Sequence, residues 1–180
     1  MWIIVVLAIA AFGVMLYNSL VKLRTRVDSA WADVDVQLKR RYDLIPNLVE
    51  TVKGYATHEK ETLDAVIQAR SAAMGAQSPE AKAQAEGMLT GALKSLFALA
   101  EAYPDLKAQS GFQQLQNTLH DIEGDVARSR QYYNAIVRDY NTKTQQIPTN
   151  LVANAFRFEE REFFELEDEA AREAPKIDFS

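Results

Sequence analysis

An amphipathic pattern runs from Val27 to Ala56, where apolar side chains recur at steps of three or four residues. This series consists of Val27, Trp31, Val34, Leu38, Tyr42, Ile45, Val49, Val52 and Ala56. The steps match one face of an α-helix, and charged side chains fill many of the positions between. The stretch therefore predicts an amphipathic helix that buries one side against partner helices.

Pro46 lies inside this stretch and leaves two arrangements open. Proline cannot donate to the carbonyl four residues earlier, and in a helix interior it costs about 3 kcal/mol. The apolar series nevertheless keeps its phase across Pro46. We expect one long helix with a kink at this residue, and the alternative is two helices that share a corner. Residues 57–59 are a candidate corner, but Leu63 and Val66 resume a helical face, so the helix is predicted to reach Ala73.

Residues 2–21 contain no charged side chain and are mostly apolar. Twenty residues at 1.5 Å per residue span about 30 Å, the thickness of the hydrocarbon core of a bilayer. We predict a retained transmembrane anchor. A cleaved signal peptide is disfavoured because no basic residue precedes the run and the run continues past the Ala-Ile-Ala sequence at 8–10. A buried core helix is disfavoured because the run has no polar face.

Three basic residues, Lys22, Arg24 and Arg26, directly follow the apolar run. Positively charged flanks tend to stay in the cytoplasm. The sequence therefore predicts a single-pass protein of the cell (inner) membrane with its N-terminus outside and its C-terminal domain in the cytoplasm. The same three side chains are expected to contact the lipid surface, where anionic headgroups attract them.

A second helix is predicted from about Pro79 to Ala102. Its start carries Ser78 as the N-cap, proline at the first helical position and an acidic residue in the first turn. Small alanines on its apolar face predict a close contact with a neighbouring helix. The apolar positions are Ala85, Met88 or Leu89, Ala92, Leu96, Leu99 and Tyr103.

A third helix is predicted from Phe112 to Ile147, after a capping box formed by Ser110 and Gln113. Its three–four repeat is sustained for five heptads, which is typical of left-handed coiled-coil packing. The repeat consists of Phe112, Leu115, Leu119, Ile122, Val126, Ser129, Tyr133, Ile136, Tyr140, Thr144 and Ile147. Short connections make neighbouring amphipathic helices antiparallel. The predicted fold is all-α: a transmembrane anchor (1–21) that continues into an antiparallel bundle (22–147), with three long helices and a short C-terminal one.

Residues 148–180 form an acidic, phenylalanine-rich C-terminal arm. They hold nine acidic and four basic residues, which accounts for the net charge of −5 of the whole chain. Five phenylalanines are interleaved with the acids: Phe156, Phe158, Phe163, Phe164 and Phe179. A purely solvating acidic tail would have few aromatic residues. Either a short helix packs these rings back on the bundle, or the arm docks on another subunit or partner.

The sequence AWADVDVQLKRRYDLIPNLVETVKGYATHE, residues 30–59, resembles the signature of the LemA family of bacterial membrane-anchored helical proteins. Further matches lie on both sides of it: Tyr17-Asn18, Leu20-Val21, Tyr133-Asn134, Ile147-Pro148 and residues 175–179. The resemblance thus covers nearly the whole chain. It implies a helical bundle on one membrane anchor and no established enzymatic activity, and it supplies no catalytic residues.

The residues themselves offer no catalytic pattern. The chain has no cysteine, neither histidine belongs to a metal-binding spacing, and no phosphate-binding glycine loop or nucleophile elbow is present. We predict a protein that is not an enzyme and has no cofactor or metal. The densest basic cluster, Lys39-Arg40-Arg41, alternates with acids in a neutral domain, which argues against nucleic-acid binding. It is expected to be a solvated helix face or to meet an acidic patch of a partner.

Two function classes remain. The first is a helical scaffold or adaptor that self-associates as a homo-oligomer in the membrane. The second is a regulator or accessory subunit of a membrane enzyme such as a zinc metalloprotease, which is an analogy drawn from LemA-like proteins. The candidate interaction residues are Lys39, Arg40, Arg41, Phe156, Phe158, Phe163, Phe164 and Phe179. The sequence identifies neither a partner nor an oligomer size.

Overall fold

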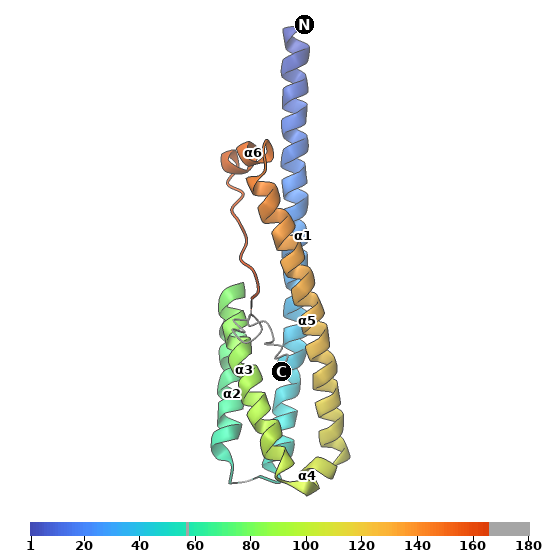
Figure 1. Ribbon diagram of the computed structural model, residues 1–180, viewed down its shortest axis with the longest axis vertical. Coiled ribbons are helices and arrows are strands. Elements are labelled where there is room, and N and C mark those ends of the chain that lie inside the picture. The colour runs from blue at the N-terminus through green and yellow to red at the C-terminus, as the bar shows by residue number, and fades with distance from the viewer. Residues whose placement is uncertain (57, 166–180) are drawn as a thin grey trace, which may run out of the picture. The chain divides into compact units, whose positions relative to one another are not determined.

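The computed structural model describes residues 1–56 and 58–165. Within these residues the chain forms six helices and no strand (Figure 1). The helices are α1 (Trp2–Lys53), α2 (Lys60–Gly75), α3 (Pro79–Glu101), α4 (Pro104–Ala108), α5 (Ser110–Gln145) and α6 (Thr149–Ala155). The predicted all-α fold class is confirmed.

Helix α1 continues through Pro46 without interruption, so one helix rather than two is confirmed at this position. The proline is exposed, whereas Ile45 and Val49 are buried. Because the ring lies on the exposed face, water can satisfy the carbonyl that lacks its usual donor. The buried positions of α1 follow the predicted apolar series and include Val27, Val34, Leu38, Tyr42, Ile45, Val49 and Val52.

Helix α1 ends at Lys53, so its predicted extension to Ala73 is wrong. In the turn that follows, the carbonyl of Val52 accepts two successive backbone N–H groups at 3.0 and 2.9 Å, and α2 is a separate helix. Ala56 and Leu63 are both buried on either side of this break. They are seven residues apart, so the heptad phase is preserved although the helix stops, and the apolar pattern could not reveal the break.

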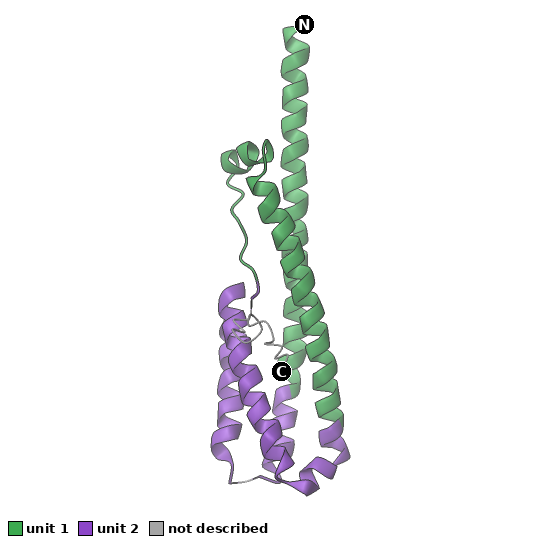
Figure 2. Cartoon of the chain, in the orientation of Figure 1, with its two compact units in different colours: residues 1–44, 114–163 green, residues 45–113, 164–180 purple. Residues whose placement is uncertain are grey.

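The chain divides into two compact units (Figure 2). Of the described residues, unit 1 comprises 1–44 and 114–163, and unit 2 comprises the remainder between 45 and 113 together with 164–165. Helices α1 and α5 therefore contribute to both units. The predicted limits after residues 21 and 147 rest on composition and not on contacts, and they stay predictions.

In unit 1, α1 and α5 pack antiparallel (Figure 1). The rings of Trp31 and Tyr133 lie with their centroids 5.1 Å apart, and Arg40 binds Asp125 at 3.3 Å, so later residues of α1 meet earlier residues of α5. The predicted repeat of α5 is buried at Leu119, Ile122, Tyr133, Ile136 and Tyr140. Its last predicted member, Ile147, is 84% exposed because α5 ends before it.

In unit 2, α2 and α3 form a helical hairpin. Ser78 caps α3 as predicted, because its hydroxyl oxygen accepts a hydrogen bond from the N–H of Ala81 at 3.2 Å. Met88 is 60% exposed and Leu89 is fully buried, which decides between the two predicted core positions. The buried residues of α3 include Ala85, Leu89, Leu93, Leu96 and Ala100.

The start of α5 is capped differently from the prediction. The side-chain oxygen of Gln109 accepts a hydrogen bond from the N–H of Phe112 at 2.8 Å, and the amide of Gln113 donates to the carbonyl of Lys107 at 3.0 Å. Ser110 is the first residue of α5. The predicted capping box of Ser110 and Gln113 is therefore wrong, because the helix begins one residue earlier than that motif requires.

Candidate functional site

The N-terminal part of α1 is long and apolar enough to cross a membrane, with a mean hydropathy of 2.3 over an 18-residue window. Every side chain from Met1 to Phe12 is exposed, and Leu20 is the first fully buried residue. A helical segment whose side chains are apolar on all sides and exposed, as they are for residues 1–12, is suited to lipid rather than to water. The predicted anchor therefore has a structural counterpart in this segment.

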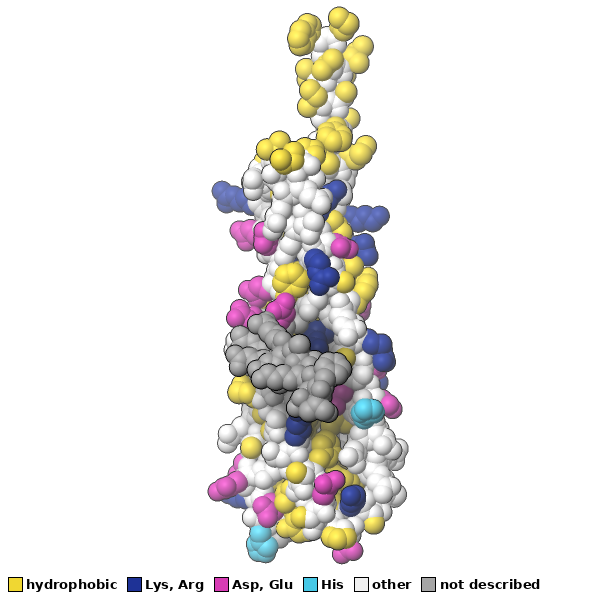
Figure 3. All heavy atoms as spheres, in the orientation of Figure 1, with side chains coloured by type: hydrophobic (Ala, Val, Ile, Leu, Met, Phe, Trp, Pro, Cys, Tyr) yellow, Lys and Arg dark blue, Asp and Glu magenta, His cyan; other side chains and the backbone are white. Residues whose placement is uncertain are grey.

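Helix α6 carries a second set of exposed apolar side chains. The chain leaves α5 at Gln145 and enters α6 after Pro148, and Thr149 and Ala153 bury the inner side of this short helix. Leu151 lies in α6, and Ile147 and Phe156 flank it; the three side chains are 68%, 84% and 62% exposed. We call these three side chains the apolar shelf. In Figure 3 hydrophobic side chains cover the N-terminal part of α1 and the neighbouring end of unit 1 that carries α6.

An open groove of about 410 Å³ separates the N-terminal part of α1 from α6. Its walls are almost entirely apolar, and both helices belong to unit 1. Gly13 has no side chain, so the α1 wall of the groove is flat at this residue. A Cβ atom placed on it would meet no atom within 4 Å. The lining residues are Ala10, Gly13, Val14, Tyr17, Val152 and Phe156.

An aromatic cluster closes one end of this groove. The ring of Tyr17 contacts Phe156 edge to face with centroids 4.9 Å apart, and it contacts Phe158 at 5.6 Å. The guanidinium of Arg24 lies over the ring of Phe158, 5.1 Å from its centroid. Such aromatic and cation–π contacts contribute about 0.5–1.5 kcal/mol each beyond simple burial. They attach the beginning of the arm to α1.

Beyond this cluster, the arm runs in an extended conformation and is held by polar side chains of α5. The hydroxyl of Tyr140 donates to the carbonyl of Glu159 at 3.0 Å, and that of Tyr133 donates to the carbonyl of Glu162 at 2.8 Å. Between them, the side-chain amide of Asn141 exchanges two hydrogen bonds with the backbone of Arg161, each 2.9 Å long. We call these four hydrogen bonds the latch.

The two phenol groups of the latch have raised pKa values. Burial raises the pKa of Tyr133 to about 12, partly opposed by the charge of Arg161, and burial also raises the pKa of Tyr140. Both phenols are therefore neutral donors over the physiological pH range. The guanidinium of Arg161 adds an ion pair with Asp28 of α1 at 2.9 Å, so the arm is connected to both long helices of unit 1.

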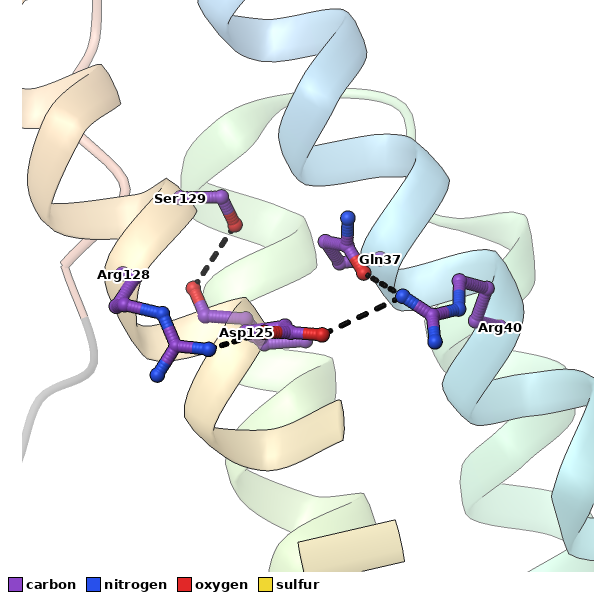
Figure 4. Close-up of polar contacts among 6 residues, drawn as sticks. Gln37, Arg40, Asp125, Arg128 and Ser129 are labelled. Atoms are coloured by element: carbon purple, nitrogen blue, oxygen red, sulfur yellow. Dashed lines mark hydrogen bonds and ion pairs between the residues drawn. The ribbon is translucent and has the colours of Figure 1, made fainter. Parts of the chain in front are cut away.

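The basic cluster at residues 39–41 lies against α5 of the same chain. Arg40 binds Gln37 at 2.8 Å and Asp125 at 3.3 Å, and Figure 4 shows the Asp125 carboxylate between Arg40 and Arg128. Arg41 is only 4% exposed and binds Glu123 at 3.1 Å. The expected solvated face is therefore wrong for Arg41, because its side chain points into unit 1, where a buried guanidinium needs a charged partner.

The other predicted site residues fall in several places. Lys39 pairs with Asp43 on its own helix at 3.2 Å with both side chains exposed, and Lys22 and Arg26 are exposed beyond the apolar segment of α1. Phe163 is half-buried and Phe164 is buried. Phe179 lies outside the described residues. Phe158 and Phe164 are buried within the chain, but residues 158–165 form no helix, so the predicted short helix does not carry these rings. Docking of the arm on another subunit stays a prediction.

Sequence reasoning missed the latch and the apolar shelf. It placed Tyr133 and Tyr140 on an apolar face, but a buried phenol also needs a hydrogen-bond partner, and that requirement was the available signal. It assigned Ile147 to a helix core because the three–four repeat extended to it. Among the described residues, no group of three or more His, Asp or Glu side chains is arranged to hold a metal ion.

The chain is similar to a known protein family and to several curated proteins. The model of the LemA family matches residues 30–179. Protein LemA of Metamycoplasma hominis is 30% identical over 141 residues, which cover 76% of this chain and 63% of that relative. Magnetosome protein MamQ 2 of Paramagnetospirillum magneticum is 25% identical over 186 residues, which cover 89% of this chain and 68% of that relative. Magnetosome protein MamQ of Magnetospirillum gryphiswaldense is 25% identical over 188 residues, covering 88% and 69%.

The family match includes most of the helical residues that follow the apolar segment. It contains the Ala30–Glu59 motif, whose residues supply the buried face of α1, and it contains all of α5 and α6. It also spans the described part of the arm with its latch. The chain belongs to the LemA family.

Proposed function

We propose that this chain is a non-enzymatic, single-pass membrane protein that acts as a self-associating helical scaffold or adaptor at the surface of the cell (inner) membrane. The observation that carries the proposal is the continuity of α1. One helix supplies both the apolar segment and the residues that bind α5. The position of the helical surface relative to the bilayer is therefore fixed by the anchor itself.

The geometry of unit 1 supports this role. Residues 22–44 extend about 33 Å beyond the apolar segment at 1.5 Å per residue. Over this length α1 is held against α5 by the Trp31–Tyr133 contact and by the ion pairs of Arg40 and Arg41. A helix with these supports presents its surface at a set distance from the membrane, which a scaffold requires. The names of the relatives specify no reaction, which agrees with a role in binding.

Exposed apolar side chains in unit 2 are a candidate surface for self-association. Ile67 and Met74 on α2 are 49% and 50% exposed. Because they are seven residues apart, they lie on the same side of the helix. Complete burial of a fully exposed side chain of this kind contributes about 1.5–3 kcal/mol, so these half-exposed side chains contribute about half of that each when a partner covers them. A second copy of the chain is the proposed occupant of this surface.

The test is the particle mass of the full chain, extracted from membranes in a mild detergent and measured by light scattering. A defined multiple of the chain mass is expected. Replacing both Ile67 and Met74 by lysine should lower the mass toward the monomer. The matched control replaces Gln68 and Ala72, two exposed residues of the same helix, by lysine and should leave the mass unchanged.

Two results would contradict self-association. The first is a monomer that carries no other protein, and the second is a monomer in a stoichiometric complex with a different membrane protein. The second result would replace the scaffold by the accessory subunit of a membrane enzyme, which is the alternative function. Equal masses for the Ile67/Met74 variant and its control would place the contact elsewhere on the chain.

A further inference from the structure

We propose that α6 makes a second contact with the membrane. In this proposal the apolar shelf of Ile147, Leu151 and Phe156 lies in the interfacial region of the bilayer that α1 crosses, and the groove between α1 and α6 holds an acyl chain of a membrane phospholipid. The inference rests on the proposed membrane anchorage, and it adds a lipid-binding site and a second attachment point.

The α1 residues that α6 contacts give the depth of α6 in the bilayer. Lys22 is the first charged residue after the apolar segment, so its ammonium group lies near the lipid headgroups. Tyr17 and Gly13 are about 7.5 and 13.5 Å further toward the bilayer centre, at 1.5 Å per residue. Phe156 contacts Tyr17, and the groove joins Val152 to Gly13. Helix α6 therefore lies about 7.5–13.5 Å below Lys22, a range that overlaps the depth of about 5–10 Å at which interfacial helices insert.

The distribution of charge around α6 fits this depth. Residues 144–156 contain no charged side chain, and the flanking residues Lys143 and Arg157 are both basic. The apolar segment of α1 is likewise followed by basic residues. Two uncharged segments thus pack side by side, and cations mark the level at which each of them ends. Anionic headgroups at that level attract lysine and arginine side chains.

Arg157, one of these cations, lies in the turn after α6 and has an unfavourable backbone conformation. The N–H of Phe158 donates to the carbonyl of Ala153 at 2.9 Å and that of Arg157 to Asn154 at 3.5 Å, which is the Schellman pattern. Arg157 occupies the left-handed position of this motif, with φ of 55°, where glycine is usual. An exposed arginine in that position brings its charge to the headgroup level.

The groove has the chemistry of a hydrocarbon site. Its walls combine aliphatic side chains of α1 with Val152 and the ring of Phe156, and it opens to the exterior beside the exposed apolar segment. A dry apolar groove at membrane depth has no source of ordered water, and lipid tails are the apolar molecules that surround it. Gly13 keeps the groove open, because a side chain at this position would project into empty space.

Depth is tested with the full chain in vesicles of phosphatidylcholine and phosphatidylglycerol. The protein has no native cysteine, so a single environment-sensitive fluorophore can be attached to Leu151→Cys. Val6→Cys in the exposed apolar segment serves as the membrane reference, and Gln84→Cys on the exposed side of α3 serves as the aqueous reference. Quenching is measured with iodide in water and with phospholipids that carry a spin label on the acyl chain.

The Leu151 label is expected to be quenched several-fold less by iodide than the Gln84 label, and several-fold more by the shallow spin-labelled lipid. If the Leu151 label behaves like the aqueous reference while the Val6 label is protected, the second contact is overturned and the anchor stands. If the Leu151 and Val6 labels are both accessible to iodide, the membrane anchorage in the proposed function fails as well.

Occupancy of the groove is tested with a phospholipid that carries a photoreactive group on its acyl chain. Cross-linking to the peptides that contain residues 10–17 or 152–156 is expected in the unmodified protein. Gly13→Leu should reduce the yield several-fold, because a Cβ atom at this position meets no other atom and the rest of the leucine side chain takes up space in the groove. Gly91→Leu is the matched control, since the space at Gly91 is also open. Equal yields from all three proteins would overturn the groove as a lipid site.

Discussion

Tyr133, Tyr140 and Asn141 show how individual polar atoms direct the arm in unit 1. All three residues lie on the buried side of α5, yet each has a polar group that requires a partner inside the protein. The arm meets this requirement with backbone groups, so its acidic side chains can vary without breaking the latch. The hydrogen bonds therefore depend on the α5 residues and on the path of the arm rather than on the arm's sequence.

Alkaline pH should weaken unit 1 through Tyr133. The pKa of this phenol is about 12 in the folded protein, against 10.0 for the free side chain. The folded state favours the neutral phenol, so the stabilisation is fully present below pH 10 and is lost as the pH rises toward 12. The full loss is about 2–3 kcal/mol, at about 1.4 kcal/mol per pKa unit. Urea unfolding followed by circular dichroism at a series of pH values measures it.

Tyr133→Phe isolates the contribution of that hydroxyl. At neutral pH the variant should lose about 1 kcal/mol, the typical net value of one hydrogen bond. The stability of Tyr133→Phe should also fall less at alkaline pH than that of the unmodified protein. The pKa of Tyr140 is raised in the same direction, so Tyr140 accounts for a further part of the alkaline loss of stability. Tyr132→Phe is the control, because this neighbouring ring is 50% exposed. Identical pH profiles for Tyr133→Phe and the unmodified protein would exclude this residue as the source.

Arg157→Gly should stabilise the protein by about 1 kcal/mol, because glycine adopts the left-handed conformation without the steric cost of a Cβ atom. Arg157→Ala removes the same charge but keeps the Cβ atom, so it should show no such gain. Thermal unfolding of both variants in detergent gives the comparison. Equal stabilities of the two variants would show that the backbone at φ of 55° is not strained.

At the scale of elements, the buried faces of helices could be predicted from sequence more reliably than the residues at which helices begin and end. The serine cap of α3 and the buried series of α1 and α5 follow from local chemistry and periodicity. The end of α1 could not be predicted, because the seven-residue step from Ala56 to Leu63 mimics a continuous helix. The cap of α5 depends on Gln109, whose long side chain can reach several donors, and the latch depends on contacts between residues distant in sequence.

Pro46→Ala should be tolerated and should stabilise α1 by up to about 3 kcal/mol, because it restores the missing donor to the helix. The exposed position of Pro46 means that the buried face is untouched by the change. Unfolding in urea, followed by circular dichroism, measures the gain. Loss of helicity in this variant would show that the proline fixes a bend the bundle requires.

At the scale of the whole molecule, the apolar segment and its basic flank predict the orientation in the membrane. Protease added to spheroplasts should leave residues 22–180 intact, because Lys22, Arg24 and Arg26 hold that part of the chain in the cytoplasm. Immunoblotting with an antibody to the bundle reads the result, and permeabilised cells are the control that shows the protease can cleave it. Digestion in intact spheroplasts would reverse the assigned orientation.

The contacts of α1 in unit 1 also fix the rotation of the apolar segment about its own axis. Tyr17, Arg24 and Trp31 are spaced by seven residues, and they contact Phe156, Phe158 and Tyr133 in turn. One side of the apolar segment therefore faces protein, and its other sides are free to face lipid in the proposed membrane. A single residue inserted between Tyr17 and Arg24 would turn the two parts by about 100° relative to each other. If the segment crosses a bilayer as proposed, torque exerted on it there would therefore reach α5 and the arm directly.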